Sequence, residues 1–145
     1  ANQVKKGDIL LSITPPVEYE DASKDIKEIY DDIMATRKTD WVNNFWKVLA
    51  TQPDLLKRTW QGVKSVMSEG SLDSLTKEMI YIAVSATNGC NYCTNSHTAG
   101  ARSKGMTDDM FAELMAVVGM ANQTNALADG FQVQVDIPFK NGGRL

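Results

Sequence analysis

The sequence predicts an all-α fold of about six to seven helices. Apolar residues recur at three- and four-residue spacing through most of the 145 residues, which is the period of amphipathic helices. Only Gln132–Val135 alternates in the manner of a β-strand, and four residues beside Gly130 are weak support for one. The length fits one hydrophobic core. We therefore expect a single domain over residues 1–145, with an irregular, extended arm over residues 1–20 and a tail over residues 137–145.

Three helices are expected in the N-terminal half. The first follows Ser23, after an arm that contains Pro15 and Pro16. A short second helix precedes Pro53, a favoured first-turn residue that opens the third, and Gly70 closes the third. The apolar residues of these helices are Ile26, Ile29, Tyr30, Ile33 and Met34, then Phe45, Trp46, Val48 and Leu49, then Leu55, Leu56, Trp60, Val63, Val66 and Met67.

Three or four helices are expected in the C-terminal half. One begins near Ser74 and ends at Asn88-Gly89, a turn and C-cap signal. The next runs over about Cys90–Lys104. Thr107, followed by two acidic residues, is a good N-cap for a sixth helix. Residues 122–130 either extend that helix or form a seventh.

Charge and hydropathy argue against two classes of partner. Fifteen basic and eighteen acidic residues give a net charge of −3, whereas nucleic-acid binding needs a basic patch. The longest central apolar stretch, Met79–Ala86, is far shorter than the roughly 20 residues that span a bilayer. Hydrophobic residues make up 43% and charged residues 23%, as in a globular protein and unlike a disordered chain. We therefore expect neither a nucleic acid nor a membrane as a partner.

Cysteine and histidine gather in one short segment. The chain has two cysteines, Cys90 and Cys93, and one histidine, His97. A disulfide between residues so close in sequence closes a small ring and contributes little to stability. The spacing therefore points to redox chemistry or to a metal, in a compartment such as the cytoplasm where thiols are kept reduced.

On a helix, these three side chains would share one face. At about 100° per residue, the spacing of Cys90, Cys93 and His97 places them within an arc of roughly 60°. A helix N-terminus would favour a thiolate on Cys90, and a neighbouring imidazole would favour one on Cys93. Spacing alone leaves open which cysteine is the more acidic. A second thiol one turn away can resolve a sulfenic acid into a disulfide.

Glu78 is an acidic residue on the preceding helix. It stands twelve positions before Cys90 inside an apolar run, and the short turn between the two helices would let it face the cysteine helix. A carboxylate in apolar surroundings tends to have a raised pKa and can act as a general base or a proton store. The pattern alone leaves two interpretations open for Glu78: such a role, or a solvated charge on an amphipathic helix.

These residues resemble the motif of a known family. The pattern is Glu78, then eleven residues, then Cys90-Asn-Tyr-Cys93-Thr-Asn-Ser-His97-Thr-Ala-Gly100-Ala, and later Asn125-Ala-Leu-Ala-Asp129-Gly130. It resembles the carboxymuconolactone decarboxylase superfamily, and most of all its AhpD-like alkylhydroperoxidase branch of the single-domain, peroxidase-related type. The resemblance covers roughly residues 41–136. It implies an all-helical, AhpD-like bundle, often assembled as trimers or hexamers, that uses no metal or haem.

The resemblance also implies roles for single residues. Cys93 would be the peroxidatic thiol, Cys90 its disulfide partner, and His97 with Glu78 a proton relay. The substrate would be a hydroperoxide, the reductant an external dithiol on a lipoyl protein or a thioredoxin-like partner, and no cofactor would be bound. The best-known member has a second histidine directly before its latter cysteine; here Tyr92 stands there and could line the substrate pocket instead. The founding decarboxylase branch lacks the cysteine pair, which argues against that reaction.

The motif has other interpretations. A structural zinc site needs four ligands, so a carboxylate such as Glu78 would have to complete the set. Haem attachment needs a histidine directly after the second cysteine, where Thr94 stands. Two buried structural thiols are a further interpretation. The alternative function is an oligomeric protein that binds a small acid or lactone and uses its thiols for redox sensing, without peroxidase turnover.

Apolar surface also predicts self-association. The third, fourth and fifth helices are strongly apolar for a domain of this length, so part of their surface should be buried between subunits. We therefore expect a homo-oligomer, which the resemblance suggests is a trimer or a hexamer.

Overall fold

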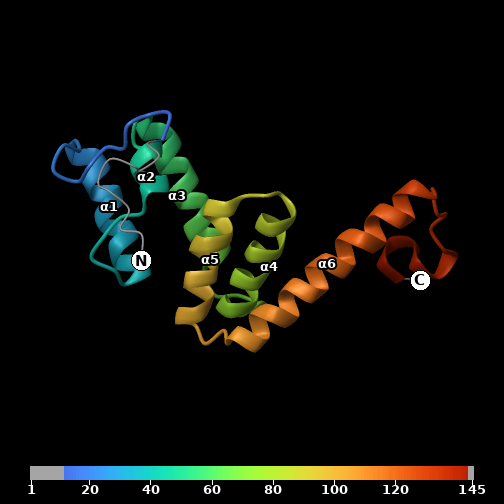
Figure 1. Ribbon diagram of the computed structural model, residues 1–145. Coiled ribbons are helices and arrows are strands. Elements are labelled where there is room, and N and C mark those ends of the chain that lie inside the picture. Colours follow the sequence, from blue (N-terminus) through green and yellow to red (C-terminus); the bar gives the residue numbers. More distant parts are fainter. Residues whose placement is uncertain (1–11, 144–145) are drawn as a thin grey trace, which may run out of the picture. The chain divides into compact units, whose positions relative to one another are not determined.

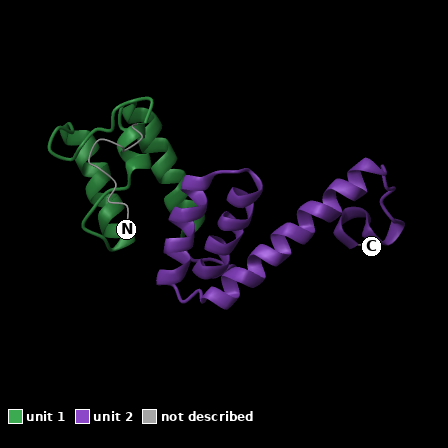
Figure 2. Ribbon diagram, viewed as in Figure 1, with its two compact units in different colours: residues 1–68 green, residues 69–145 purple. Residues whose placement is uncertain are grey.

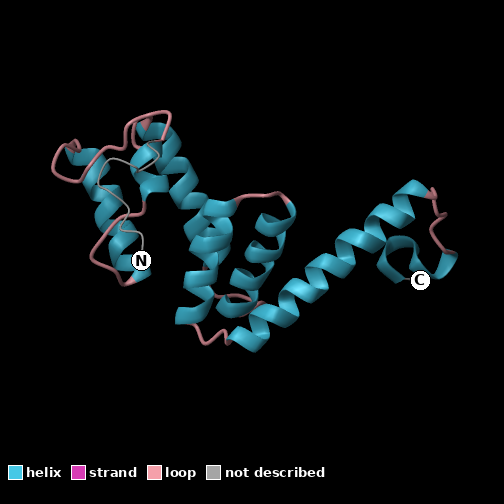
Figure 3. Cartoon of the chain, in the orientation of Figure 1, coloured by secondary structure: helices cyan, strands magenta, loops and turns pink. Residues whose placement is uncertain are grey.

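The computed structural model describes residues 12–143 and is all-α, as predicted (Figure 1). No strand occurs among these residues, and the segment Gln132–Val135 is a turn followed by irregular backbone (Figure 3). Part of the expected arm, residues 1–11, lies outside the described residues, and the rest of it contains no helix. The chain forms two compact units, residues 1–68 and 69–145 (Figure 2). The single domain expected from the length stays a prediction.

The first unit contains three α-helices: α1 (Lys24–Arg37), α2 (Asn44–Leu49) and α3 (Pro53–Met67). Ser23 is the N-cap of α1 and Pro53 begins α3, as predicted, but α3 ends before Gly70. Helix α3 packs against both α1 and α2. Their apolar faces meet in a core that consists of Ala22, Ile26, Tyr30, Ile33, Val42, Trp46, Ala50, Leu56 and Trp60.

The second unit contains α4 (Ser74–Thr87), α5 (Asn91–Ser103) and α6 (Asp108–Gly130). Helix α4 packs along α5 and also against α6. Oxygen atoms of side chains cap α4 and α6: the carboxylate of Asp73 accepts a hydrogen bond from the Thr76 amide, and the hydroxyl of Thr107 accepts one from the Met110 amide. A small core, formed by Ile82, Ala101 and Met106, holds the unit together.

Two glycines lie in the short connections between α4, α5 and α6. Gly89, with φ of +71°, lies between α4 and α5, and Gly105, with φ of +99°, lies between α5 and α6. These left-handed conformations favour glycine because it has no Cβ. The connection at Gly89 reverses the chain between α4 and α5, which pack against each other.

The structure decides between the two predictions for residues 122–130. Helix α6 runs without a break through residues 122–130, so this segment extends the helix and does not form a separate one. The expected tail contains a short 3-10 helix, η1 (Ile137–Gly143), whose backbone departs from helical geometry at Lys140, Asn141 and Gly142. None of the described helices is both long enough and apolar enough to cross a membrane.

Candidate active site

The turn before α5 places Cys90 at the N-terminus of that helix. Cys90 is the N-cap of α5, with a non-helical backbone (φ −81°, ψ 88°), and its amide donates to the Ser85 carbonyl at 2.9 Å. The helix expected from about Cys90 therefore begins one residue later, at Asn91, and Cys90 caps it. The hydrogen bond to Ser85 and the left-handed Gly89 hold Cys90 in the turn.

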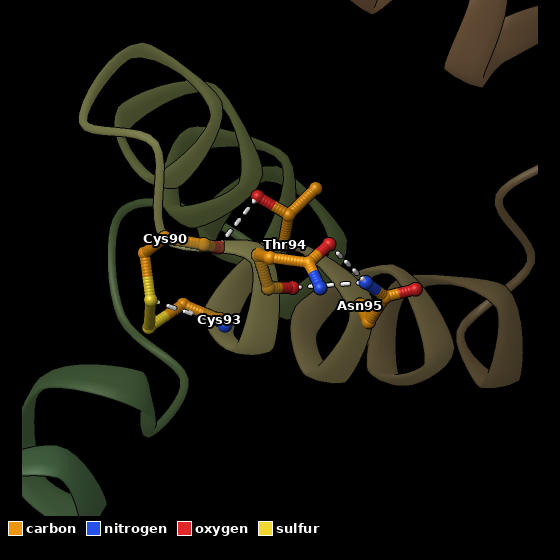
Figure 4. Close-up of a disulfide and its surroundings, with 5 residues drawn as sticks. Cys90, Cys93, Thr94 and Asn95 are labelled. Carbon is orange, nitrogen blue, oxygen red and sulfur yellow. Dashed lines mark hydrogen bonds between the residues drawn. A yellow bond between two sulfur atoms is a disulfide. The ribbon is translucent and has the colours of Figure 1, made fainter. Parts of the chain in front are cut away.

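The two cysteines form one redox pair at the N-terminus of α5. Their sulfur atoms are joined in a disulfide, and their Cα atoms lie 5.3 Å apart (Figure 4). The Cys93 amide donates to Cys90 Sγ at 3.2 Å, so the sulfur takes the place that an oxygen usually has in a helix cap. The hydroxyl of Thr94 donates to the Cys90 carbonyl at 3.0 Å and fixes the same turn. Both sulfurs therefore lie where helix amides favour a negative charge.

His97 lies one turn further along α5. It is four residues after Cys93, so the two side chains lie on the same face of the helix. The ring of Tyr81 on α4 stacks on the imidazole, with the centroids 3.7 Å apart and the planes at 19°. His97 Nδ1 lies 2.7 Å from Glu78 Oε2, which is a hydrogen bond between α5 and α4. The stack and the hydrogen bond together fix the orientation of the ring.

Glu78 is a buried carboxylate, only 6% exposed, and faces α5 as expected. Its Oε2 binds His97 Nδ1, and its Oε1 accepts a hydrogen bond from the ammonium of Lys104, which follows α5 as its C-cap. Burial raises the pKa of Glu78, but the hydrogen bonds and charges of His97 and Lys104 outweigh burial and hold the pKa below its ordinary value of 4.5. The raised pKa expected from the apolar sequence around Glu78 is therefore wrong.

An ionised Glu78 decides how the imidazole is protonated. A carboxylate only accepts hydrogen bonds, so Nδ1 of His97 must be the donor. In the neutral ring, the lone pair then resides on Nε2, and this nitrogen is the one that can accept a proton. The site therefore combines a cysteine pair with an imidazole that is held by a buried carboxylate and whose Nε2 can accept a proton.

Gly100 makes room for the carboxylate. A Cβ at this position would lie 3.1 Å from Oε1, 3.2 Å from Cδ and 3.3 Å from Oε2 of Glu78. These distances are shorter than ordinary van der Waals contacts, and the carboxylate is held through both oxygens. Gly100 therefore lets the side chain of Glu78 lie directly against the backbone of α5.

Gly100→Ala should consequently cost stability, although alanine is the better helix former. At Gly119 on α6, where a Cβ meets nothing within 4 Å, the matched change Gly119→Ala should stabilise the protein by about 0.5–1 kcal/mol. Gly100→Ala should lose this gain and be less stable than the wild type, because the pinned carboxylate must shift. Urea unfolding of both variants measures the difference. Equal stabilisation by the two changes would contradict the close packing of Glu78 on Gly100.

Two residues at this site were not predicted from the sequence. Lys104 continues the same face of α5 as His97 and Gly100, at a spacing of three and then four residues, and this spacing was visible in the sequence. Tyr81 is three residues after Glu78 on α4 and carried no signal of its own. Tyr92 is 43% exposed, and its place in a substrate pocket stays a prediction.

In the described part of the chain, no cluster of three or more histidine, cysteine or acidic side chains could hold a metal ion.

Comparison with known proteins identifies relatives of this arrangement. The sequence profile described as the carboxymuconolactone decarboxylase family matches residues 53–136. Among solved structures, the chain is similar to the alkylhydroperoxidase AhpD core from Rhodospirillum rubrum, with a TM-score of 0.84 and 50% identity over 88% of this chain and 96% of that one.

Two relatives found by sequence carry no assigned function. Uncharacterized protein 4 in the cox locus of Paracoccus denitrificans is 35% identical over 72 residues, which are 45% of this chain and 65% of that protein. An uncharacterized protein of Cupriavidus necator is 32% identical over 85 residues, which are 58% of this chain and 74% of that protein. The chain thus spans slightly less than two thirds of the first of these relatives.

Proposed function

Because the chain belongs to the carboxymuconolactone decarboxylase family, in its AhpD-like branch, we propose that it is a thiol-dependent alkylhydroperoxide reductase with an antioxidant role. One observation carries the proposal: a Cys-x-x-Cys pair lies at the N-terminus of the same helix whose histidine is bound to a buried, ionised carboxylate. A purely structural disulfide has no need of such a neighbour. A peroxidatic thiol needs a base that takes its proton.

In the proposed first step, Cys93 reacts with the hydroperoxide. Nε2 of His97 accepts the thiol proton, and the Cys93 thiolate attacks the terminal oxygen of the substrate. A sulfur–oxygen bond forms, the oxygen–oxygen bond breaks, and the alkoxide leaves as an alcohol with the proton that His97 returns. Glu78 stabilises the imidazolium that exists between these two proton transfers. Cys93 is then a sulfenic acid, and the peroxide has been reduced by two electrons.

In the proposed second step, the thiol of Cys90 attacks the sulfenic sulfur of Cys93. The sulfur–sulfur bond forms and water leaves, which returns the pair to the disulfide (Figure 4). An external dithiol, on a lipoyl protein or a thioredoxin-like partner, reduces this disulfide and is itself oxidised. The cycle needs no bound cofactor.

The proposed cycle needs a reducing compartment, and we therefore place the protein in the cytoplasm. Tyr92, on the exposed side of the same helical turn, is proposed to line the entrance for the hydroperoxide.

Steady-state turnover tests the proposed function. The reduced protein is mixed with cumene hydroperoxide and an excess of dihydrolipoamide, and the loss of both compounds is followed. We expect many turnovers, with one dithiol oxidised for each peroxide consumed. The matched control is the double variant Cys90→Ser, Cys93→Ser, which should not exceed the uncatalysed rate. Consumption of a single equivalent without turnover, as in a protein that only senses peroxide, would contradict the proposal.

We also propose that the protein works as a homo-oligomer, a trimer or a hexamer. Support comes from α6, in which no residue is buried and Val117, Met120 and Leu127 are each at least half exposed. Apolar side chains on so long a helix are usually covered by another surface. Light scattering after size exclusion should give a multiple of the chain mass of 16.0 kDa. A monomer at micromolar concentration would contradict this proposal.

A further inference from the structure

Lys104 binds the carboxylate of the relay from the side opposite to the histidine. Its ammonium contacts Oε1 of Glu78, while Oε2 of the same carboxylate binds His97 Nδ1. The side chain of Lys104 is 34% exposed, whereas that of Glu78 is 8% exposed, so the ion pair reaches from the surface into the unit. Both partners of Glu78 come from α5, and the carboxylate itself comes from α4. One oxygen of Glu78 therefore binds an imidazole, and the other binds an ammonium group.

This arrangement has an electrostatic consequence. A buried carboxylate alone would strongly favour an imidazolium beside it, and a histidine that is already protonated cannot accept the proton of a thiol. The ammonium of Lys104 offsets the negative charge of Glu78. The ammonium therefore opposes the addition of a second positive charge on the other side of the same carboxylate.

Other titratable groups also lie near the Glu78–His97 pair. Tyr81 of α4 stacks on the imidazole, and Cys93, which is joined to Cys90, lies four residues before His97 on the same face of α5. Helix α6 also packs on α4, but its Asp108 is paired with Arg102 and lies 89% exposed. Lys104 is the cation whose ammonium contacts the carboxylate of Glu78.

We propose that Lys104 is a positioning residue of the relay: it fixes Oε1 of Glu78 and opposes proton uptake by the Glu78–His97 pair, so that His97 is neutral when the thiol needs a base. This inference rests on the proposed peroxidase for its purpose, but not for its test. The pair takes up protons as a coupled unit, whether or not a peroxide is ever reduced.

The test uses the fact that the chain contains one histidine. Proton uptake by the pair is followed through the Cε1–H resonance of His97 in the folded protein, without peroxide. In Lys104→Met, which keeps the apolar stem and removes the charge, the midpoint should rise by about 1 pH unit. Lys104→Arg, which keeps the charge, should titrate close to the wild type. Arg102→Met, which removes an exposed cation from the same end of α5, should not move the midpoint.

Two results would overturn the inference: an unchanged midpoint in Lys104→Met, or an equal rise in Lys104→Arg and Lys104→Met. Circular dichroism establishes that each variant is folded, and Lys104→Gln takes the place of the methionine variant if that one does not fold. If the protein also reduces peroxide, the acidic limb of its rate profile should move to higher pH in Lys104→Met by the same amount. Lack of peroxidase activity with a shifted midpoint would reject the proposed function and retain the role of Lys104.

Discussion

Cys93→Ser is expected to abolish peroxide reduction completely, whereas Cys90→Ser should allow one reaction and then stop. In the first variant no sulfur stands four residues before His97, and the serine hydroxyl is far too weak an acid to replace a thiol. In the second variant Cys93 can still attack the peroxide, but its sulfenic acid has no partner. Rapid-mixing measurements should therefore show a burst of one equivalent in Cys90→Ser and none in Cys93→Ser.

The trapped intermediate identifies which sulfur reacts. Dimedone, which labels sulfenic acids, should modify Cys93 in the Cys90→Ser protein after one equivalent of cumene hydroperoxide. A serine is close in size to a cysteine, so neither variant should lose its fold, and circular dichroism checks this. If the burst and the label instead appear in Cys93→Ser, the roles of the two cysteines are exchanged. That result would contradict the mechanism, which assigns the attack on the peroxide to Cys93, the cysteine four residues before His97 on the same face of α5.

Glu78→Gln is expected to have the second largest effect. Glutamine keeps the shape of the side chain but carries no charge, so it cannot stabilise an imidazolium at His97. The rate of peroxide reduction should fall by about 10²- to 10⁴-fold, the usual contribution of positioned acid–base groups. The exposed Glu113 on α6 is the matched control, and Glu113→Gln should leave the rate unchanged. A fall of less than threefold in Glu78→Gln would contradict the relay.

The same variant tests how Glu78 affects stability. Because the folded protein holds the pKa of Glu78 below 4.5, the ionised carboxylate binds protons less readily in the folded than in the unfolded chain. Its contribution to stability is therefore fully present above the ordinary carboxyl pKa and is lost as the pH falls through the lowered value. The difference in the free energy of unfolding between wild type and Glu78→Gln should be largest near neutral pH. Urea unfolding at several pH values measures it, and a difference that grows on acidification would contradict this sign.

The helices could be predicted from the sequence because their signals are local. Ser23, Pro53 and Thr107 mark helix starts through backbone preferences that act within one turn, and the structure has helices at each of these positions. The C-terminal extent of α6 could not be decided in the same way. Between residues 122 and 130 no proline or internal glycine interrupts the chain, but several of its polar residues are weak helix formers, so continuation and a break were both compatible with the local pattern.

The electrostatics of the site could be predicted only in part. The spacing from Cys93 to His97 and the turn after α4 were enough to place Glu78 opposite the cysteine helix. The direction of the Glu78 pKa shift could not be predicted, because it depends on hydrogen bonds and charges from His97 and Lys104 together, and Lys104 is 26 residues away in sequence, at the C-cap of another helix. The residues next to Glu78 in sequence are apolar, which predicts burial and a raised pKa. The groups that lower the pKa, His97 and Lys104, are distant in sequence and become neighbours only in the folded protein. Long-range charge pairs are therefore where the sequence argument was least complete.

The central claim is that Cys90 and Cys93 form a disulfide when the protein reduces a hydroperoxide. The most direct test is the state of these two sulfurs after a single equivalent of oxidant. The fully reduced wild-type protein is treated with one equivalent of cumene hydroperoxide, and the intact chain and its proteolytic peptides are weighed by mass spectrometry. We predict one product within seconds: a chain two hydrogen atoms lighter, in which Cys90 is bonded to Cys93, and which a dithiol returns to its first mass. A chain that keeps both thiols, that accumulates sulfinic acid at Cys93, or that links to a second chain through these cysteines would contradict the central claim.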